Sequence, residues 1–380
     1  MDYNKLALDL HKKYKGKLTT RLRDERTLDK DTLSAYYSPG VAEVSRKIAK
    51  DPSQLPNYTW TNNLVAVISD GSAVLGLGDI GPRASMPVME GKGLLFKYFA
   101  DIDSVPITLD VHEPDEIINT IKAIHSSFGA INLEDIAAPK CFEIEKRLKE
   151  ELDIPVFHDD QHGTAIVTLA GLINSMKVTG KTLSNCKIVL IGAGAAGVAI
   201  ADLLHKYAQP NIIAIDSRGV ISKDRTDLNE HKLRLAGYAH QEKNNNPTNL
   251  QQAIKNADIV IGISKGNMLS PDDISSMNED AIVFGLANPI PEIMPDIAKQ
   301  AGAAIVATGR SDLPNQVNNA IAFPGIFRGA LDNGVKKITD NHKIAAAEVI
   351  ASLVDSPNAD NVIPSVLNEK LVPSIAKVIN

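Results

Sequence analysis

A glycine pattern in the middle of the chain indicates a dinucleotide-binding loop. An apolar run ends in Gly192-x-Gly194-x-x-Gly197 and leads into a helix-like stretch. Glycine permits the tight turn, the close approach of backbone to a pyrophosphate and the packing of the helix on the strand. The N-terminus of the helix then attracts the phosphate charge. Ala195 and Ala196 complete the predicted cofactor-binding loop.

An acidic residue at the end of the following apolar run supports this interpretation. Asp216 stands at the spacing at which a carboxylate binds the ribose hydroxyls of NAD. Its charge would repel the 2′-phosphate of NADP, so NAD is the expected cofactor, although Arg218 could accommodate NADP. The alternative is a tight strand–helix turn that holds no ligand.

A second copy of the glycine pattern begins at Gly76, and we reject it as a cofactor loop. Asp79 would place a negative charge where the pyrophosphate must lie. Pro82 and Pro87 follow, which predicts that no regular helix continues from the turn. No acidic residue closes a second strand at the required distance.

Two acidic pairs follow candidate strands and predict a divalent-metal site. Glu134-Asp135 comes after the apolar run 130–133, and Asp159-Asp160 comes after 154–157. Both places face the ligand crevice of a doubly wound sheet. Converging carboxylates repel one another unless a cation is present, and oxygen ligands suit Mg²⁺ or Mn²⁺. The alternative is that these residues are solvated loop acids or helix caps.

Several single residues have two interpretations. Lys92 precedes an apolar stretch, where burial near a cation would lower its pKa and make it a general base. Taken alone, the residue favours the other interpretation, a surface lysine whose stem covers apolar neighbours. Tyr37, beside a Ser-Pro-Gly turn, is on sequence evidence a packing residue. His158 and His162 flank the second acidic pair, but zinc would need further nitrogen or sulfur ligands, so hydrogen-bonded loop histidines are favoured.

Asparagines occur at two further places with suitable chemistry. Asn288 follows the candidate strand 281–286, and Asn318-Asn319 precede an apolar segment. An asparagine at a strand end can hydrogen-bond a carboxamide or a carboxylate, and it can also cap a turn.

The elements that must position these residues alternate between strands and helices. This alternation predicts an α/β fold, with an N-terminal α/β domain (1–160) followed by a Rossmann-type doubly wound parallel sheet and C-terminal helices (161–380). The expected strands are 64–69, 105–109, 130–133, 154–157, 187–191, 212–216, 258–263, 281–286 and 304–307. The expected helices include 91–100, 114–127, 139–152 and 163–177.

Composition argues against a nucleic-acid-binding, a secreted or a membrane-spanning protein. The 380 residues suffice for two cores, and the net charge of −6 without a basic block argues against a nucleic-acid partner. Cys141 and Cys186 lack metal-type spacing and are expected to be buried thiols in a reducing cytosol. The N-terminus is not that of a signal peptide, and no segment has the length and apolarity of a membrane span, so a cytoplasmic location is expected.

Taken together, eight sequence blocks resemble the malic enzymes, in particular the short bacterial form. They occur in order from about 37 to 330 and are Tyr37-Ser-Pro-Gly-Val-Ala, Ser69-Asp-Gly-Ser-Ala-Val-Leu-Gly-Leu-Gly-Asp-Ile-Gly, Met89-Glu-Gly-Lys92, Asn132-Leu-Glu134-Asp135-Ile, Phe157-His-Asp-Asp160-Gln-His-Gly-Thr-Ala, Gly192-Ala-Gly-Ala-Ala-Gly, Leu286-Ala-Asn288-Pro and Asn318-Asn319-Ala-Ile-Ala-Phe-Pro-Gly. In the block that begins at Ser69, the larger malic enzymes carry an arginine for the substrate carboxylate. This chain has Ser72-Ala73 at those positions.

The resemblance implies a role for each matching residue. Tyr37 would be the general acid, Lys92 the general base, and Asp159 would orient Lys92 or the metal water. The implied metal ligands are Glu134, Asp135 and Asp160. The implied cofactor contacts are the Gly192–Gly197 loop, Asp216 and Asn288, and the implied substrate contacts are Asn288, Asn318 and Asn319.

The implied reaction is the oxidative decarboxylation of (S)-malate to pyruvate and CO₂ with reduction of NAD or NADP, dependent on Mg²⁺ or Mn²⁺. A homodimer is also implied, and Tyr37 could act across its subunits. Three alternatives stay open at this point: a metal-dependent oxaloacetate decarboxylase on the same scaffold, a non-catalytic dinucleotide-binding regulatory subunit, and another hydroxy-acid dehydrogenase.

Overall fold

A parallel four-stranded sheet forms the first half of the molecule. The computed structural model describes residues 3–14, 17–18, 20–23, 28–74, 76–240 and 247–380. The strands are β1 (Leu64–Ser69), β2 (Asp103–Thr108), β3 (Ala130–Leu133) and β4 (Val156–His158), in the order β2-β1-β3-β4. Every residue of β1 is buried, because helices cover both faces of a parallel sheet and leave no solvated side.

The second half contains a six-stranded sheet in the order β10-β9-β8-β5-β6-β7. Its strands are β5 (Lys187–Ile191), β6 (Asn211–Asp216), β7 (Gly219–Val220), β8 (Ile259–Gly262), β9 (Ala281–Gly285) and β10 (Ala303–Thr308). All pairs are parallel except β6 with the short β7, a strand that we did not predict. The order reverses at β5, which creates a ligand crevice at the carboxyl ends of β5 and its neighbours. The predicted α/β fold with a Rossmann-type second sheet is confirmed.

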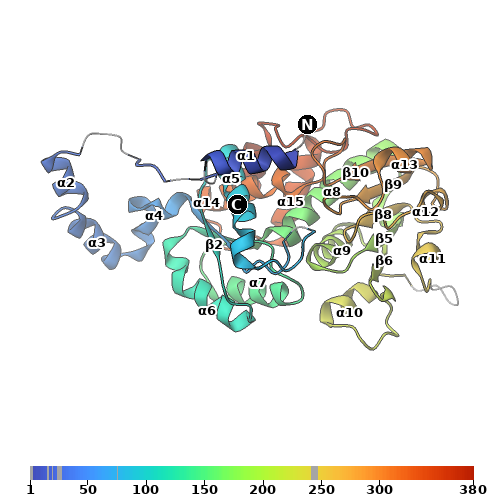
Figure 1. Ribbon diagram of the computed structural model, residues 1–380, viewed down its shortest axis with the longest axis horizontal. Coiled ribbons are helices and arrows are strands. Elements are labelled where there is room, and N and C mark those ends of the chain that lie inside the picture. Colours follow the sequence, from blue (N-terminus) through green and yellow to red (C-terminus); the bar gives the residue numbers. More distant parts are fainter. Residues whose placement is uncertain (1–2, 15–16, 19, 24–27, 75, 241–246) are drawn as a thin grey trace.

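Helices surround both sheets (Figure 1). Those of the first half are α1 (Tyr3–Tyr14), α2 (Lys30–Tyr36), α3 (Val41–Lys50), α4 (Leu55–Tyr58), α5 (Gly81–Ala100), α6 (Pro114–Ile124), α7 (Lys140–Glu151) and α8 (Asp159–Thr179). Those of the second half are α9 (Ala195–Ala208), α10 (Glu230–Ala236), α11 (Leu250–Ile254), α12 (Pro271–Ser275), α13 (Pro295–Gln300), the 3₁₀ helix η5 (Asn319–Ile321), α14 (Phe323–Asp332), α15 (Asp340–Ser352) and α16 (Leu371–Ala376).

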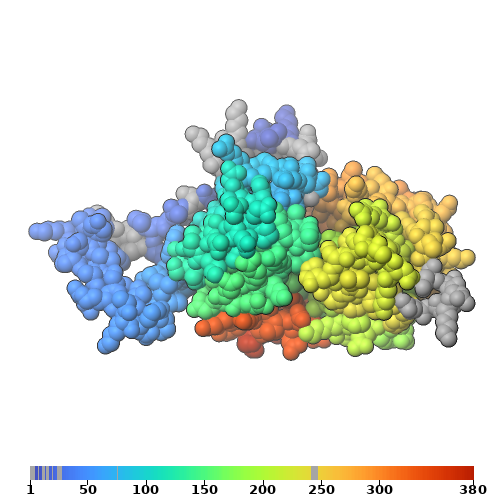
Figure 2. All heavy atoms as spheres, turned by 90° about the horizontal axis from the view of Figure 1, so that it is seen from below, coloured from blue at the N-terminus to red at the C-terminus, as the bar shows by residue number. Residues whose placement is uncertain are grey.

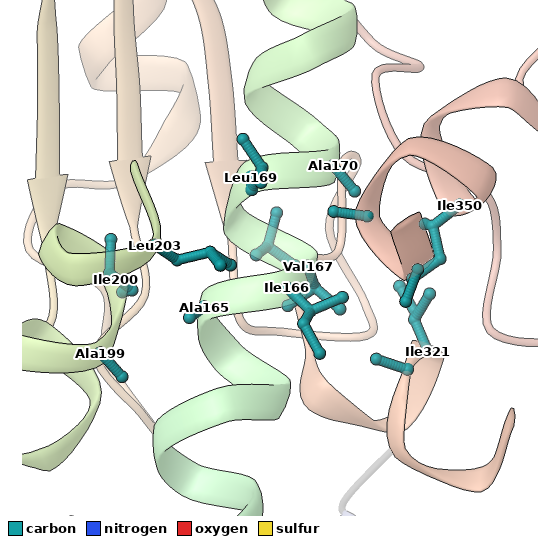
Figure 3. Packing of buried hydrophobic residues seen from close by; sticks show 14 of the residues in the cluster. Ala165, Ile166, Val167, Leu169, Ala170, Ala199, Ile200, Leu203, Ile321 and Ile350 are labelled. Carbon is teal, nitrogen blue, oxygen red and sulfur yellow. The ribbon is translucent and has the colours of Figure 1, made fainter. Parts of the chain in front are cut away.

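Helix α8 lies in the centre of the molecule. Its middle turns are almost wholly buried, and Figure 3 shows them between α9 on one side and the C-terminal elements on the other. Leu203 of α9, Ile321 of η5 and Ile350 of α15 belong to the same hydrophobic cluster as Ile166 and Leu169. Because α8 begins with Asp159 and Asp160, this packing holds the predicted catalytic carboxylates in a rigid frame.

The C-terminal helices pack against the first sheet as well as the second. Phe323 and Phe327 of α14 contact the ring of Phe96 on α5, with centroid distances of 4.7 and 5.0 Å. Arg328 donates to the side chain of Asn63 at 2.6 Å. One hydrophobic core therefore continues through both halves of the chain.

The segment that carries α2 and α3, residues 30–50, forms an arm that projects from the body (Figures 1 and 2). Neither helix contains a buried residue. Tyr37, directly after α2, is 70% exposed. Among the described residues, the arm contacts the segment that follows it, where Lys47 lies over the ring of Tyr58 at 4.9 Å, but it buries none of its helical residues.

One local prediction about the second glycine pattern was wrong. A regular helix, α5, does begin at Gly81 and continues to Ala100. Pro82 occupies the first turn, where the absent N–H has no intrahelical partner to lose, and the helix also accommodates Pro87.

Two smaller observations concern the whole chain. Cys141 and Cys186 are free and buried, as predicted. None of the helices in the described residues is long and apolar enough to cross a membrane.

Candidate active site

The carboxyl ends of β3 and β4 meet α5 and bring five predicted residues together. Lys92 of α5 is 7% exposed, and its Nζ lies 2.6 Å from Asp159 Oδ2 and 2.8 Å from Glu134 Oε1. Asp160 Oδ2 accepts a hydrogen bond of 2.7 Å from the backbone N–H of Asp135. A buried lysine thus lies beside four carboxylates at one edge of the sheet.

Three of these carboxylates form a group that fits a divalent cation. Ligand atoms of Glu134, Asp135 and Asp160 lie within 4.8 Å of one another. Burial raises the pKa of Glu134, and the charge of Asp160 raises it further. Carboxylate oxygens are the donors that Mg²⁺ and Mn²⁺ prefer, and a cation would remove the mutual repulsion. The residues present therefore suit the predicted metal.

The pKa of Lys92 is raised, whereas the sequence led us to expect a lowered one. Burial favours the neutral amine, but the charges of Asp159, Glu134 and Asp160 outweigh it and raise the pKa of Lys92 above its ordinary value. The prediction of a lowered pKa assumed a nearby cation, which would offset the same carboxylates. For Asp159, burial outweighs the attraction of Lys92 and raises the pKa to about 6.

Three residues that we did not predict complete this cluster. Asn132 donates from Nδ2 to Glu134 Oε2 at 2.9 Å. The ring of Phe323 lies under Lys92, with 4.5 Å from Nζ to its centroid. A Cβ at Gly163 would lie 1.9 Å from Asp159 Oδ1, so only glycine leaves room for this carboxylate. The sequence signal for all three was that each lies in one of the blocks that resemble the malic enzymes.

Histidine takes no part in the group of ligand atoms. His158 is fully buried, and neither ring nitrogen has a hydrogen-bond partner among the described residues, although Nδ1 lies 3.7 Å from Asp160 Oδ2. His162 forms hydrogen bonds with Glu145 and Lys343 instead. Burial lowers the pKa of His162 to about 3, so the ring is neutral.

Tyr37 does not join the cluster within its own chain. It belongs to the projecting arm (Figure 2), whereas Lys92 is buried in the body. Its hydroxyl forms no hydrogen bond with any other part of the chain that the structure describes.

The glycine loop has the conformation that its sequence predicts. Gly192 has a φ of +114°, which side chains rarely adopt. A Cβ at Gly197 would lie 2.0 Å from the carbonyl oxygen of Gly192, so the third glycine allows the helix to pack on the strand. A Cβ at Gly194 would meet no atom within 4 Å, which leaves the loop surface open at the N-terminus of α9. The loop also reaches the first half, because Ala195 packs against its hydrophobic cluster.

Asp216 ends β6 as predicted, but its carboxylate is already paired. Arg225 donates to both of its oxygens, at 2.8 and 3.1 Å, and Lys232 donates at 2.7 Å. The side chain of Arg218 pairs with Asp227. The sequence placed Arg218 near the ribose site but gave no sign of Arg225 or Lys232, which come from later loops and α10.

Of the predicted asparagines, Asn288 and Asn318 lie in loops and Asn319 begins η5. Asn288 follows β9 and is exposed. A Cβ at Gly76 would lie 2.4 Å from the backbone oxygen of Asn288, so the second glycine pattern serves contact between the two halves. Asn318 caps η5 by accepting from Ala320 N, and the Cβ of Asn319 approaches Gly163 beside Asp159.

Comparisons with known proteins match malic enzymes along the chain. The family model "Malic enzyme, N-terminal domain" matches residues 15–149, and "Malic enzyme, NAD binding domain" matches residues 161–378. A bifunctional malic/malolactic enzyme of Bacillus subtilis is 50% identical over 382 residues, covering 100% of this chain and 92% of the relative. An NADP-dependent malic enzyme of Halomonas elongata is 48% identical, covering 92% and 82%.

A solved structure shows that the fold matches as well as the sequence. The NAD-dependent malic enzyme of Thermotoga maritima superposes with a TM-score of 0.94 at 47% identity, covering 98% of both chains. The buried lysine, the acidic group and the glycine loop thus occur in a chain whose sequence and fold both match one family. This chain belongs to the malic enzymes.

Proposed function

We propose that the protein oxidises (S)-malate at C2 and removes CO₂ to give pyruvate, with NAD as hydride acceptor and a divalent cation as cofactor. One observation carries the proposal: the buried Lys92–Asp159 pair lies beside the acidic group of Glu134, Asp135 and Asp160. Besides the hydride acceptor, such a reaction requires an amine that can move a proton and a site for a cation.

The two absent groups would each supply one kind of chemistry. Glu134, Asp135 and Asp160 would hold Mg²⁺ or Mn²⁺, which stabilises negative charge on a substrate oxygen when bound. The loop from Gly192 to Gly197 would hold the cofactor, whose nicotinamide accepts the hydride when bound.

Side chains of the protein would carry out the proton transfers. Lys92 takes the proton of the 2-hydroxyl, and Asp159 holds the amine in position at 2.6 Å. Lys92 must first be neutral, so the carboxylates that raise its pKa must be offset before it acts. Asn288, Asn318 and Asn319 supply amides for the substrate carboxylates and the nicotinamide.

The general acid that protonates C3 would be Tyr37 of a second copy of the chain. The arm that carries Tyr37 is exposed, and large apolar side chains gather on and beside it: Leu28, Leu33, Tyr36, Val41, Tyr58 and Trp60. Exposed apolar patches on soluble proteins mark contact surfaces. We therefore propose a homodimer in which the arm of each chain completes the site of its partner.

Cofactor selection would follow from the surroundings of Asp216. NAD is the expected cofactor because the carboxylate disfavours a 2′-phosphate. Arg225 and Lys232 already offset that charge, which supports use of NADP as well. We further propose a division of the chain at residue 160 and a cytoplasmic location, consistent with the free buried thiols.

The test is an assay of the purified protein with L-malate, Mn²⁺ and NAD. The proposal predicts NADH and pyruvate, and loss of both when EDTA is added. Pyruvate from oxaloacetate without any NADH from malate would favour the decarboxylase instead. Cofactor binding without turnover of either acid would favour a regulatory subunit.

A second candidate activity comes from the Bacillus subtilis relative, which is named as a malic and malolactic enzyme and matches this chain from end to end. The same site could convert malate to lactate if the reduced cofactor stays bound until pyruvate accepts its hydride. Lactate without net NADH would identify this outcome in the same assay.

A further inference from the structure

One buried carboxylate outside the predicted site holds both sides of the catalytic turn. Glu145 of α7 accepts a hydrogen bond of 2.9 Å from the backbone N–H of His158 through Oε1. Its other oxygen, Oε2, lies 2.8 Å from His162 Nε2. His158 immediately precedes Asp159 and Asp160, and His162 follows them by two residues. The two contacts of Glu145 therefore bracket the residues that carry the proposed chemistry.

Glu145 is buried with enough partners to remain ionised. The residue is 6% exposed, and Lys149, one turn along α7, lies 2.7 Å from Oε1. A buried carboxylate is costly unless hydrogen bonds and an opposite charge surround it. The partners offset that cost, but they do not explain why the contacts fall on both ends of one turn.

The orientation of the His162 ring follows from its other neighbour. Nζ of Lys343 on α15 lies 3.0 Å from His162 Nδ1. An ammonium group can only donate, so Nδ1 accepts from Lys343 and Nε2 carries the proton that is donated to Glu145. Lys149 Nζ also lies 3.4 Å from Nε2, but its shorter contact, 2.7 Å, is with Glu145 Oε1. Lys343 is 7% exposed and also pairs with Asp340, at 3.1 Å. The network thus connects α7, the start of α8 and α15.

We propose that Glu145 is a positioning residue that fixes the first turn of α8, so that Asp159 meets Lys92 and Asp160 meets the cation. This inference rests on the proposed function. Catalytic groups must be held to within about 0.5 Å, and the partners of metal ligands change metal affinity by about 10- to 100-fold. The bond to the His158 backbone sets where the turn begins, and the bond to His162 sets its direction.

Two neutral substitutions of His162 test the inference without changing the charge near the metal. In His162→Gln, the amide nitrogen takes the place of Nε2 and still donates to Glu145. In His162→Asn, the shorter amide reaches the place of Nδ1 and leaves Glu145 Oε2 without its donor. The dissociation constant of Mn²⁺ is measured by electron paramagnetic resonance of the free ion, and the melting temperature is recorded for each variant.

We expect His162→Asn to raise the Mn²⁺ dissociation constant about tenfold, and His162→Gln to keep it within about threefold of the wild-type value. Glu145→Gln should raise it as well, because an amide has a single acceptor oxygen and cannot accept from both the His158 backbone N–H and His162. Glu143→Gln is the matched control, since Glu143 is exposed on the same helix. If either His162→Asn or Glu145→Gln fails to fold, the other variant still decides the question.

The outcomes separate this inference from the proposed function. Wild-type protein that does not bind Mn²⁺ would refute the metal-dependent function itself. Wild-type protein that binds Mn²⁺, with equal constants in His162→Asn and His162→Gln, would overturn only the positioning role. A lowered melting temperature with unchanged Mn²⁺ affinity would likewise show that Glu145 is merely structural.

Discussion

Replacing Asp160 by Asn should reverse the order of stability between wild-type and variant protein when Mn²⁺ is added. Without metal, the carboxylates of the acidic group repel one another across no more than 4.8 Å. At an effective dielectric constant of about 20, one such pair costs about 3 kcal/mol. The Asp160 side chain is 30% exposed and is attracted by Lys92, so we expect about 1 kcal/mol to remain. Asn keeps an oxygen for the Asp135 N–H, and the metal-free variant should therefore be more stable.

Bound Mn²⁺ reverses this order. At a concentration 100 times the dissociation constant, Mn²⁺ stabilises the wild-type protein by about 2.7 kcal/mol. Loss of one carboxylate that weakens binding about 100-fold leaves the variant a gain of about 0.4 kcal/mol at the same concentration. The wild-type protein should then be the more stable by about 1 kcal/mol.

Differential scanning calorimetry in EDTA and in Mn²⁺ measures both halves of this prediction. Asp153→Asn is the control, because Asp153 is an exposed acid close by in the sequence. It should leave the Mn²⁺ shift unchanged. An Asp160→Asn variant that melts below wild type in EDTA and keeps the full Mn²⁺ shift would refute the assignment of Asp160 as a metal ligand.

Three further predictions concern the proton, the arm and the cofactor. Lys92→Ala should lose about 10²- to 10⁴-fold in malate oxidation while NAD binding, measured by fluorescence, is retained; unchanged turnover would end its role as base. If Tyr37 acts across subunits, mixing inactive Tyr37→Phe and Lys92→Ala chains should restore about a quarter of wild-type activity, since half of the dimers gain one intact site; no recovery after verified subunit exchange would contradict this. Arg225→Met should unmask the charge of Asp216 and raise the ratio of kcat/KM for NAD over NADP about tenfold, whereas an unchanged ratio would show that Arg225 does not affect selection.

The strands and the acidic pairs were predictable because their signals are local. β1, β3 and β5 occupy the expected ranges, since each is a short, mainly apolar run. Glu134 and Asp160 end up together because the carboxyl ends of parallel strands meet at one edge. Neither conclusion needs knowledge of the side-chain packing.

The remaining features depend on contacts between distant segments, which the sequence does not reveal. Phe323 approaches Lys92 only because α14 returns to the first sheet, and Arg225 reaches Asp216 from a later loop. The raised pKa of Lys92 results from three carboxylates acting together. The proline rule failed at Pro82, because the first turn of a helix tolerates proline.

The most direct test of the central claim uses L-malate labelled with ¹³C at C4, supplied with NAD and Mn²⁺. Our account predicts one labelled CO₂ for each NADH formed, and neither product in EDTA. NADH without labelled CO₂ would indicate a simple hydroxy-acid dehydrogenase, and labelled CO₂ without net NADH would indicate decarboxylation without net oxidation. Either result would contradict oxidative decarboxylation at this site.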